Sequence, residues 1–521
     1  MTDTKTQTGT GSGFTRRGLM QTGAAGALLL GMGMPALAEP KRGGKMRMGK
    51  GHGQTSDSPD PGTWENGFTL SYGFAIYNRL TEVDVDGSLI PELAESWEAS
   101  ADATQWTFKI RDAKFHDDTK ITAADVIASM NHHRGEESQS AAKPIVSAIK
   151  DIEAVGDNAV KFTLDGGNAD FPFVLTDYHL VIGKDDGSGK VDWNSGIGSG
   201  TYVRKNFEPG IRLDLVRHEN NWRKDRGWFD EVEMLAIVDP VARQNALMTG
   251  AVDAIDRVDV KTVNLLKRNP NLIIESVAGT QHFTFPMRVN QEPFNDNNIR
   301  MALKLSVKRQ EMLDKVLQGY GALGNDIPLS SSQRFFNSDI PQRAYDPEKA
   351  KWHLKQAGAE GLSVDLHAAN AAFPGAIDAA SLYAASASEA GIKINVIRAA
   401  DDGYWSNIWN NKGWCACYWG GRPIEDLMFS TAYQSGVPWN DTAWSNERFD
   451  ELLLQARAEL DENLRREMYY EMQVILHDTG GLIAPMFASY VSAIDKKVQH
   501  GPMASNWPLD GERWMERWWF A

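Results

Sequence analysis

Cysteine is scarce in this sequence, since only Cys415 and Cys417 occur among its 521 residues. A bridge between two positions this close along the chain would be strained, and a disulfide framework needs more than two thiols. Two thiols also fall short of the three or four ligands that a zinc site needs. We therefore expect two free thiols, with no metal and no cofactor.

Basic clusters are missing as well. The formal net charge is −15 at pH 7, and no sustained run of lysine and arginine occurs. Because nucleic acids are bound through clustered positive charges, this composition excludes nucleic acid as the partner. No stretch after residue 38 is apolar for long enough to cross a bilayer, so we predict no membrane-spanning segment in the mature chain.

Signatures of catalysis are also lacking. The sequence has no His-Glu-x-x-His motif and no phosphate-binding loop, and Ser199 lacks the Gly-x-Ser-x-Gly register of a nucleophile elbow. The Ser-x-x-Lys pattern at residues 147–150 has no companion motif. We therefore predict that the protein is not an enzyme.

The first 38 residues have the pattern of an export signal. Arg16 and Arg17 precede a weakly apolar run at residues 24–34, and Ala36-Leu37-Ala38 forms a small-x-small cleavage site. The arginine pair predicts a twin-arginine signal peptide over residues 1–38; the alternative is a general secretory signal with a fortuitous pair. No cysteine lies at the cleavage site, so we expect no lipid anchor. A free exported product predicts the periplasm as the location.

Apolar residues recur with both strand and helix periods in the rest of the chain. Hydrophobic residues make up 42% and charged residues 24% of a chain long enough for two or three globular domains. Alternation predicts strands at Trp106, Phe108 and Ile110, at Val160, Phe162 and Leu164, and at Ile211, Leu213 and Leu215. Helical spacing predicts helices capped by Thr122 with Asp125, following Asp296, through Phe449, Leu452, Leu453 and Ala456, and through Met468, Met472, Ile475 and Leu476. The mixture predicts α/β domains, and glycine- and serine-rich stretches at 184–199 and 319–332 predict loops or domain crossings.

A series of motifs occurs in order between about residues 70 and 490. They are Leu89-Ile90-Pro91-Glu92-Leu93-Ala94-Glu95-Ser96-Trp97, Trp106-Thr107-Phe108-Lys109-Ile110 with Phe115-His116-Asp117-Asp118, Gly198-Ser199-Gly200-Thr201-Tyr202, Asn220-Asn221-Trp222, Thr249-Gly250-Ala251-Val252-Asp253, Pro293-Phe294-Asn295-Asp296 with Arg300-Met301-Ala302-Leu303, and Trp444-Ser445-Asn446-Glu447-Arg448-Phe449-Asp450. This set closely resembles the signature of the family 5 extracellular solute-binding proteins, the dipeptide, oligopeptide and nickel binding group. Most of these residues identify a fold rather than a ligand.

The resemblance implies an α/β, bilobed fold like that of type II periplasmic binding proteins, with an additional domain inserted in the first lobe. Lobe I would comprise residues 39–70, 190–280 and 490–521. The inserted domain would be residues 71–189, and lobe II would be residues 281–489. The ligand would lie in the cleft between the lobes, which close around it.

The function that the resemblance implies is that of a periplasmic receptor for an ABC importer. It would capture a peptide or a peptide-sized polar solute, anions included, as a monomer. Its partners would be the permease and ATPase complex of the inner membrane, and the twin-arginine translocase during export. Two alternatives remain open: a binder of a metal chelate or haem on the same scaffold, and a periplasmic enzyme exported by the twin-arginine route.

One segment departs from the peptide-binding pattern. Peptide-binding members carry a Gly-Trp-x-x-Asp motif whose Asp pairs with the α-ammonium of the peptide. The matching segment here contains Trp414 but places Cys417 at the position of the Asp. A neutral thiol cannot offset a buried ammonium, although Glu425 or Asp426 could replace the Asp. Arg422 follows in the same segment, and a guanidinium suits a carboxylate, phosphate or sulfonate.

We therefore predict that seven residues line the ligand. They are Trp414, Cys417, Tyr418, Trp419 and Arg422 in lobe II, with Trp64 and Phe68 where the first cleft-facing loop of the family falls. For the aromatic residues the alternative is an ordinary core position. For Arg422 the alternative is an ion pair that stabilises its lobe.

Overall fold

The computed structural model describes residues 39–400, 404–422 and 424–521, and residues 40–521 form one compact unit. The predicted signal peptide lies outside the described residues. Helices and strands are interleaved along the chain, which confirms the predicted α/β class. Within the described ranges, no helix combines the length and the apolar composition that crossing a membrane requires.

The strands are β1 Lys45–Lys50, β2 Thr81–Val83, β3 Leu89–Pro91, β4 Ala94–Ala99, β5 Gln105–Ile110, β6 Ile149–Ala154, β7 Ala159–Leu164, β8 Tyr202–Glu208, β9 Arg212–Arg217, β10 Glu231–Ala236, β11 Ala254–Ile255, β12 Leu272–Thr284, β13 Gly321–Leu323, β14 Ser363–Ala368, β15 Lys393–Arg398, β16 Cys417–Trp419, β17 Met486–Asp495, β18 Val498–Gln499 and β19 Trp519–Phe520. The helices are α1 Gly67–Ile76, α2 Ala123–His132, α3 Phe171–Val174, α4 Pro240–Met248, α5 Val263–Leu266, α6 Asn297–Leu305, α7 Arg309–Val316, α8 Pro347–Gln356, α9 Ala376–Ser388, α10 Tyr404–Asn407, α11 Glu425–Ala432, α12 Glu447–Ala458, α13 Glu462–Thr479, α14 Pro508–Gly511 and α15 Trp514–Arg517.

The largest sheet has the strand order β16-β12-β17-β11-β1-β10-β9-β8, and β13 pairs with β17 beside this path. β1 runs parallel to β10 and β11, whereas the other pairs are antiparallel. The predicted strand at Leu213 and Leu215 is β9, and both side chains are buried. Ile211 lies in the turn before this strand and is exposed, so the alternation overestimated the strand by one residue.

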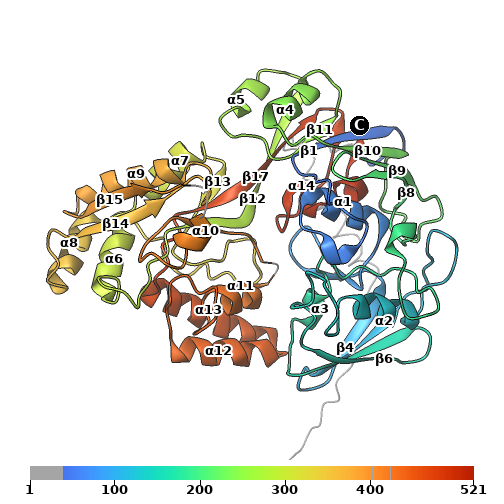
Figure 1. Ribbon diagram of the computed structural model, residues 1–521, viewed down its shortest axis with the longest axis horizontal. Helices are drawn as coiled ribbons and strands as arrows, with labels where there is room; N and C mark the ends of the chain where they lie inside the picture. Colours follow the sequence, from blue (N-terminus) through green and yellow to red (C-terminus); the bar gives the residue numbers. More distant parts are fainter. Residues whose placement is uncertain (1–38, 401–403, 423) are drawn as a thin grey trace, which may run out of the picture. The chain divides into compact units, whose positions relative to one another are not determined.

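Two long strands, β12 and β17, are neighbours near the β16 end of this sheet and run side by side (Figure 1). Their register is regular from Leu272 opposite Asp495 to Ala278 opposite Ser489, and it resumes at His282 opposite Phe487. The intervening residues of β12, 279–281, are opposite a single residue of β17, which is a β-bulge. A Cβ at Gly279 would lie 2.7 Å from the Tyr490 ring, so the bulge needs glycine there.

The second sheet, β4-β5-β7-β6, contains the other two predicted strands as β5 and β7. Phe108 on β5 and Phe162 on β7 pack with their ring centroids 5.6 Å apart. The predicted capping box opens α2, because the backbone N–H of Thr122 donates to the Asp125 carboxylate at 2.8 Å. Buried residues between Leu80 and Ile182 form a core of their own.

Further cores bring together segments that lie far apart in the sequence. One core contains Trp64 and Trp514 and combines residues 46–77 and 181–254 with the last thirty residues. Two others, around Trp414 and around Trp419, draw their residues from 283–488. The predicted helices in this region are confirmed as α6, α12 and α13, whose predicted apolar residues are buried or partly buried. The domain boundaries themselves stay a prediction.

A buried ion network joins the C-terminal tail to the segment that follows α1. Glu82 is inaccessible to solvent, and its carboxylate contacts the guanidinium groups of Arg223, Arg226, Arg513 and Arg517. Burial alone would raise the pKa of Glu82, but the four arginines together hold it well below its usual value. The ionised carboxylate is therefore an integral part of the fold.

Candidate functional site

Three adjoining pockets form what we call the groove. The tail pocket is lined by Phe74, Val83, Thr176, Asp177, Tyr178, Asn506, Trp507, Gly511, Arg513 and Arg517. The central pocket is lined by Val83, Asp84, Gly87, Phe173, Thr280, Ser332, Gln333, Arg334, Arg422, Ile424, Glu425, Ser505 and Asn506. The hinge pocket is lined by Ala278, Gly279, Ala322, Leu323, Asn325, Ile327, Leu329, Ser330, Ser331, Ser332, Phe336, Ser338, Ile340, Gln342 and Phe487. The tail and central pockets share Val83 and Asn506, and the central and hinge pockets share Ser332.

The central pocket takes its walls from segments far apart in the sequence. Asp84 and Asn506 approach from the side of the C-terminal tail, whereas Arg334 and Arg422 come from the segment between the two long strands. Thr280, at the bulge of β12, completes the wall. A solute held here would contact both sides and the strand that joins them, so its binding would depend on how the two sides are arranged.

Arg422 supplies a positive charge to the central pocket. Its Nη1 donates long hydrogen bonds to the carbonyls of Gly420, at 3.4 Å, and Gly421, at 3.3 Å. Among the residues that the structure describes, no carboxylate lies within 4.0 Å of this guanidinium. Burial lowers the pKa of Arg422, and Tyr178 opposes this shift. Because a guanidinium remains protonated in proteins, Arg422 is a largely buried cation without an ion-pair partner among the described residues.

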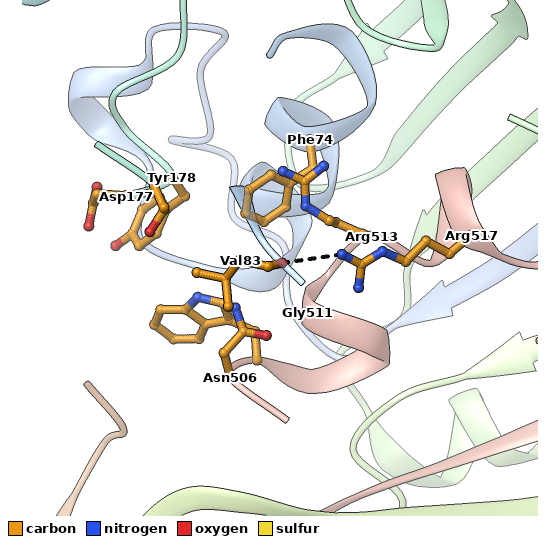
Figure 2. A pocket seen from close by; sticks show the side chains of 10 residues that line it. Phe74, Val83, Asp177, Tyr178, Asn506, Gly511, Arg513 and Arg517 are labelled. Carbon is orange, nitrogen blue, oxygen red and sulfur yellow. Dashed lines mark hydrogen bonds between the residues drawn. The ribbon is translucent and has the colours of Figure 1, made fainter. Parts of the chain in front are cut away.

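The tail pocket adds aromatic walls (Figure 2). The rings of Tyr178 and Trp507 meet edge to face, with centroids 5.9 Å apart. The Arg513 guanidinium lies 4.9 Å from the centroid of the Phe74 ring at the far wall. Burial raises the pKa of Tyr178, and the positive charge of Arg422 acts against that rise. The phenol of Tyr178 therefore lies within electrostatic reach of Arg422.

One row of side chains crosses four strands of the large sheet beside the hinge pocket. Trp419 is opposite His282, His282 is opposite Phe487, and Phe487 is opposite Ala322. Residues directly opposite each other in a sheet project to the same face, so these four lie on one face. Phe487 and Ala322 line the hinge pocket, whereas Trp419 packs into the core that also contains Leu329.

His282 has a neutral ring in this row. It is fully buried, and burial lowers its pKa to about 4, with the charge of Arg422 adding to the shift. Nδ1 lies 3.1 Å from the carbonyl oxygen of Thr280, and since a carbonyl only accepts, Nδ1 carries the hydrogen. Nε2 is then an acceptor, and it has no hydrogen-bond partner within the described part of the chain.

Cys417 lies next to a buried carboxyl group. Oδ2 of Asp441 accepts hydrogen bonds from the indole N–H of Trp409, at 3.0 Å, and of Trp419, at 3.2 Å. Burial raises the pKa of Asp441 to about 6. Burial also raises the pKa of the Cys417 thiol, and Asp441 adds to that rise. Position 417 therefore contributes no negative charge near neutral pH.

Comparison with known proteins identifies the family of this chain. Residues 88–441 match the family described as bacterial extracellular solute-binding proteins, family 5 (middle region). The chain belongs to this family. Its members are solute-binding proteins rather than enzymes.

Relatives cover most of this family 5 protein. It is similar to the dipeptide-binding protein of Escherichia coli (strain K12), with 24% identity over 467 residues that cover 81% of this chain and 86% of the relative. It is also similar to heme-binding protein A of Haemophilus influenzae, with 27% identity over 449 residues, 77% of this chain and 80% of the relative. The solved structure of HbpA2 from Haemophilus parasuis superimposes with a TM-score of 0.80 at 20% identity, covering 90% of this chain and 99% of that one. The fold is therefore the bilobed fold that the sequence predicted.

The predicted ligand residues of this solute-binding protein are only partly gathered. Arg422 lines the central pocket, and Cys417 and Trp419 project from β16 toward the core on the face that carries His282. Tyr418 projects to the opposite face, where it is 41% exposed and contacts Trp405. Their contacts with ligand stay predictions.

Three further predicted residues, besides Cys417 and Trp419, lie inside cores. The indole N–H of Trp414 donates to the Phe285 carbonyl at 3.2 Å, and its ring packs against Tyr383. Trp64 and Phe68 have no exposed surface and belong to the core that contains Trp514. None of the three lines the groove in this structure, and their contacts with ligand stay predictions.

The two acidic residues that could replace the missing Asp differ in their surroundings. Asp426 is paired with Arg457 at 3.0 Å. Glu425 lines the central pocket, and its carboxylate accepts from the Phe335 backbone N–H at 2.7 Å. Burial raises the pKa of Glu425, which weakens it as a counter-charge for an ammonium.

Sequence reasoning missed several groove residues, notably Tyr178, Arg334, Asn506 and Trp507. None belongs to a motif, and they meet only after segments more than 300 residues apart have folded together. Within the described ranges, no group of three or more His, Cys, Asp or Glu side chains could hold a metal ion.

Proposed function

We propose that this protein is the periplasmic receptor of an ABC importer and that its solute is peptide-sized and carries an anionic group bound by Arg422. The solute lies in the groove, and the receptor passes it to a permease and ATPase complex in the inner membrane. Family membership supports the receptor role. Relatives named for dipeptides and for heme support a solute of that size range.

The Arg422 guanidinium is the observation that carries the anionic class. It lines the central pocket with only two long hydrogen bonds to carbonyls and no carboxylate within ion-pair distance among the described residues. A ligand carboxylate would give it bidentate, charge-assisted hydrogen bonds. Such a partner also offsets the cost of keeping an unpaired charge away from water.

At the position of the peptide-binding motif, the described residues offer a free amine no comparable partner, and Asp84 is the remaining carboxylate in the central pocket. Cys417 stays neutral because burial raises its pKa. Asp426 already pairs with Arg457, and burial favours the neutral form of Glu425. An ammonium brought close to Arg422 would also be repelled. Solutes whose amine is blocked or absent therefore fit better than short unmodified peptides.

We further propose that the lobes follow the predicted boundaries and move about the bulge of β12. The ladder between β12 and β17 is already interrupted at residues 279–281. Bending there would break fewer hydrogen bonds than bending anywhere else along the two strands.

A calorimetric panel of short peptides tests the proposed ligand class. N-acetylated di- and tripeptides with a free carboxylate should bind the purified receptor at least tenfold more tightly than the same peptides with a free amine. Amidation of the carboxylate should abolish binding, because Arg422 then loses its anion. The opposite order, with submicromolar binding of unmodified peptides that acetylation removes, would show that an amine anchor exists and that the anionic class is wrong.

We also propose export of the folded receptor by the twin-arginine route. Changing Arg16→Lys together with Arg17→Lys should leave the precursor in the cytoplasm, because the translocase reads the arginine pair. Cell fractionation and immunoblotting measure the distribution. A matched change outside the pair, Lys5→Arg, should not alter export. Normal periplasmic accumulation of the double variant would favour the general secretory alternative.

A further inference from the structure

We propose that the hinge pocket holds an uncharged, largely apolar group of the same solute whose anionic group binds Arg422. This proposal rests on the proposed function, because it assigns a second part of one ligand. It names a site that no motif in the sequence indicates, and it narrows the solute to a molecule with an anion at one end and a neutral, bulky group at the other.

The hinge pocket is large enough for such a group. Its volume is about 280 Å³, whereas an apolar cavity of roughly 150 Å³ already accepts benzene. The space lies between one face of the large sheet and the segment 325–342. Ala322 and Phe487, neighbours in the cross-strand row, form its floor.

The walls suit a group without charge. No charged side chain lines this pocket among the residues that the structure describes. The amide groups of Asn325 and Gln342 already donate to backbone carbonyls of the surrounding segment, at 3.1 Å and 2.9 Å. Serines form the rim, and Ser331 and Ser338 are exposed. A charged group would be desolvated here without a counter-charge, whereas a ring or short alkyl chain would gain by burial.

One solute can occupy this pocket and reach Arg422. Ser332 lines both the hinge pocket and the central pocket, so the two pockets are neighbours that share one wall residue. The occupant would also touch both long strands, because Ala278 and Gly279 come from β12 and Phe487 comes from β17. A bulky group in this position would contact the bulge of β12 and would therefore favour one arrangement of the two lobes.

Two probes that differ only at one end test this assignment by calorimetry. N-benzoyl-Ala-Ala and N-acetyl-Ala-Ala share the carboxylate but differ in their neutral group. The wild-type receptor should bind the benzoyl probe about tenfold more tightly, from the apolar area of one ring. N-(4-carboxybenzoyl)-Ala-Ala should lose this advantage, because its added charge has no partner in the pocket.

Substitutions that fill the hinge pocket should remove the preference for the benzoyl probe over the acetyl probe. Ala322→Leu and Ala278→Leu reduce the space from two different walls. Each should weaken binding of the benzoyl probe about tenfold, while the affinity for the acetyl probe stays within twofold of the wild type. Ala385→Leu, on the exposed face of α9, is the matched control and should change neither affinity. Agreement between the two pocket variants guards against a folding defect in either one.

The experiments distinguish failure of the hinge-pocket assignment from failure of the proposed solute class. Equal affinity of the two probes for the wild type, or a benzoyl preference that survives both filling substitutions, overturns the hinge-pocket assignment. If Arg422→Ala leaves both affinities unchanged while the filling substitutions still remove the preference, the hinge pocket stands and the anion anchor is wrong. If neither probe binds the wild type at millimolar concentration, the proposed solute class fails, and the assignment of the pocket fails with it.

Discussion

Arg422→Ala is expected to weaken binding of the anionic solute by about 1.5–3 kcal/mol, the range for a hydrogen bond to a charged group, or roughly 10- to 150-fold in Kd. The loss is large because this guanidinium has no carboxylate partner among the described residues and would give its full charge to the ligand. Arg422→Lys should recover part of the affinity, since it keeps the charge but not the bidentate geometry. Isothermal calorimetry with N-acetylated peptides, or with any solute that co-purifies, measures the effect.

The same substitution elsewhere in the chain provides the control. Arg448 lies on α12, is half exposed and pairs with Glu471 at 2.8 Å. Arg448→Ala should therefore leave the affinity unchanged. Wild-type affinity in Arg422→Ala would mean that the anion binds elsewhere, and an equal loss in both variants would mean that the effect is not specific to Arg422.

Glu82→Gln should cost the protein more stability than any surface substitution. The change is nearly isosteric, but it removes the charge that four buried arginines surround. Glu92, Glu516 and Asp510 also pair with these arginines, so the loss should lie at or below the roughly 3–5 kcal/mol that removing one partner from a buried ion pair typically costs. Urea unfolding followed by circular dichroism should show this loss as a lower midpoint.

Glu95→Gln is the matched control for this experiment. Glu95 pairs with Lys109 at 2.6 Å on the exposed side of the second sheet, so its loss should not move the unfolding midpoint. A Glu82→Gln midpoint equal to that of the wild type would show that water or a rearranged arginine compensates the cluster, contrary to our interpretation.

The sequence predicted those helices and strands whose buried residues recur at a regular spacing along the chain. In α12, the four apolar residues at helical spacing are the ones that the fold buries. The strand at β9 was overestimated at Ile211, because the hydrogen bond from its backbone N–H to the carbonyl of Glu208 closes a turn and turns the side chain to solvent. The stretch 319–332 was predicted as a loop or crossing and contains β13, whose pairing partner lies more than 160 residues later at Phe487.

The residues of the candidate site also divide into those that could be predicted from the sequence and those that could not. Arg422 could be predicted because the replacement of an acidic motif by Cys417 and a nearby guanidinium is visible within one short segment. Tyr178 and Asn506 could not be, since they meet only through the tertiary fold. Trp64 looked like a cleft residue from its place in the family pattern. Its ring instead packs so closely on Gly73 that a Cβ there would lie 2.2 Å from it, and no part of it reaches solvent.

The order in which the chain is synthesised bears on the strand order of the large sheet. β17 separates β12 from β11 and begins only at Met486, so the sheet that contains β1 cannot be joined to β12 until nearly the whole polypeptide has left the ribosome. The core around Trp64 also waits for Trp514 and Trp518, among the last residues made. The part of the large sheet that connects β12 to β1 therefore forms late, after the core between Leu80 and Ile182 has been synthesised in full.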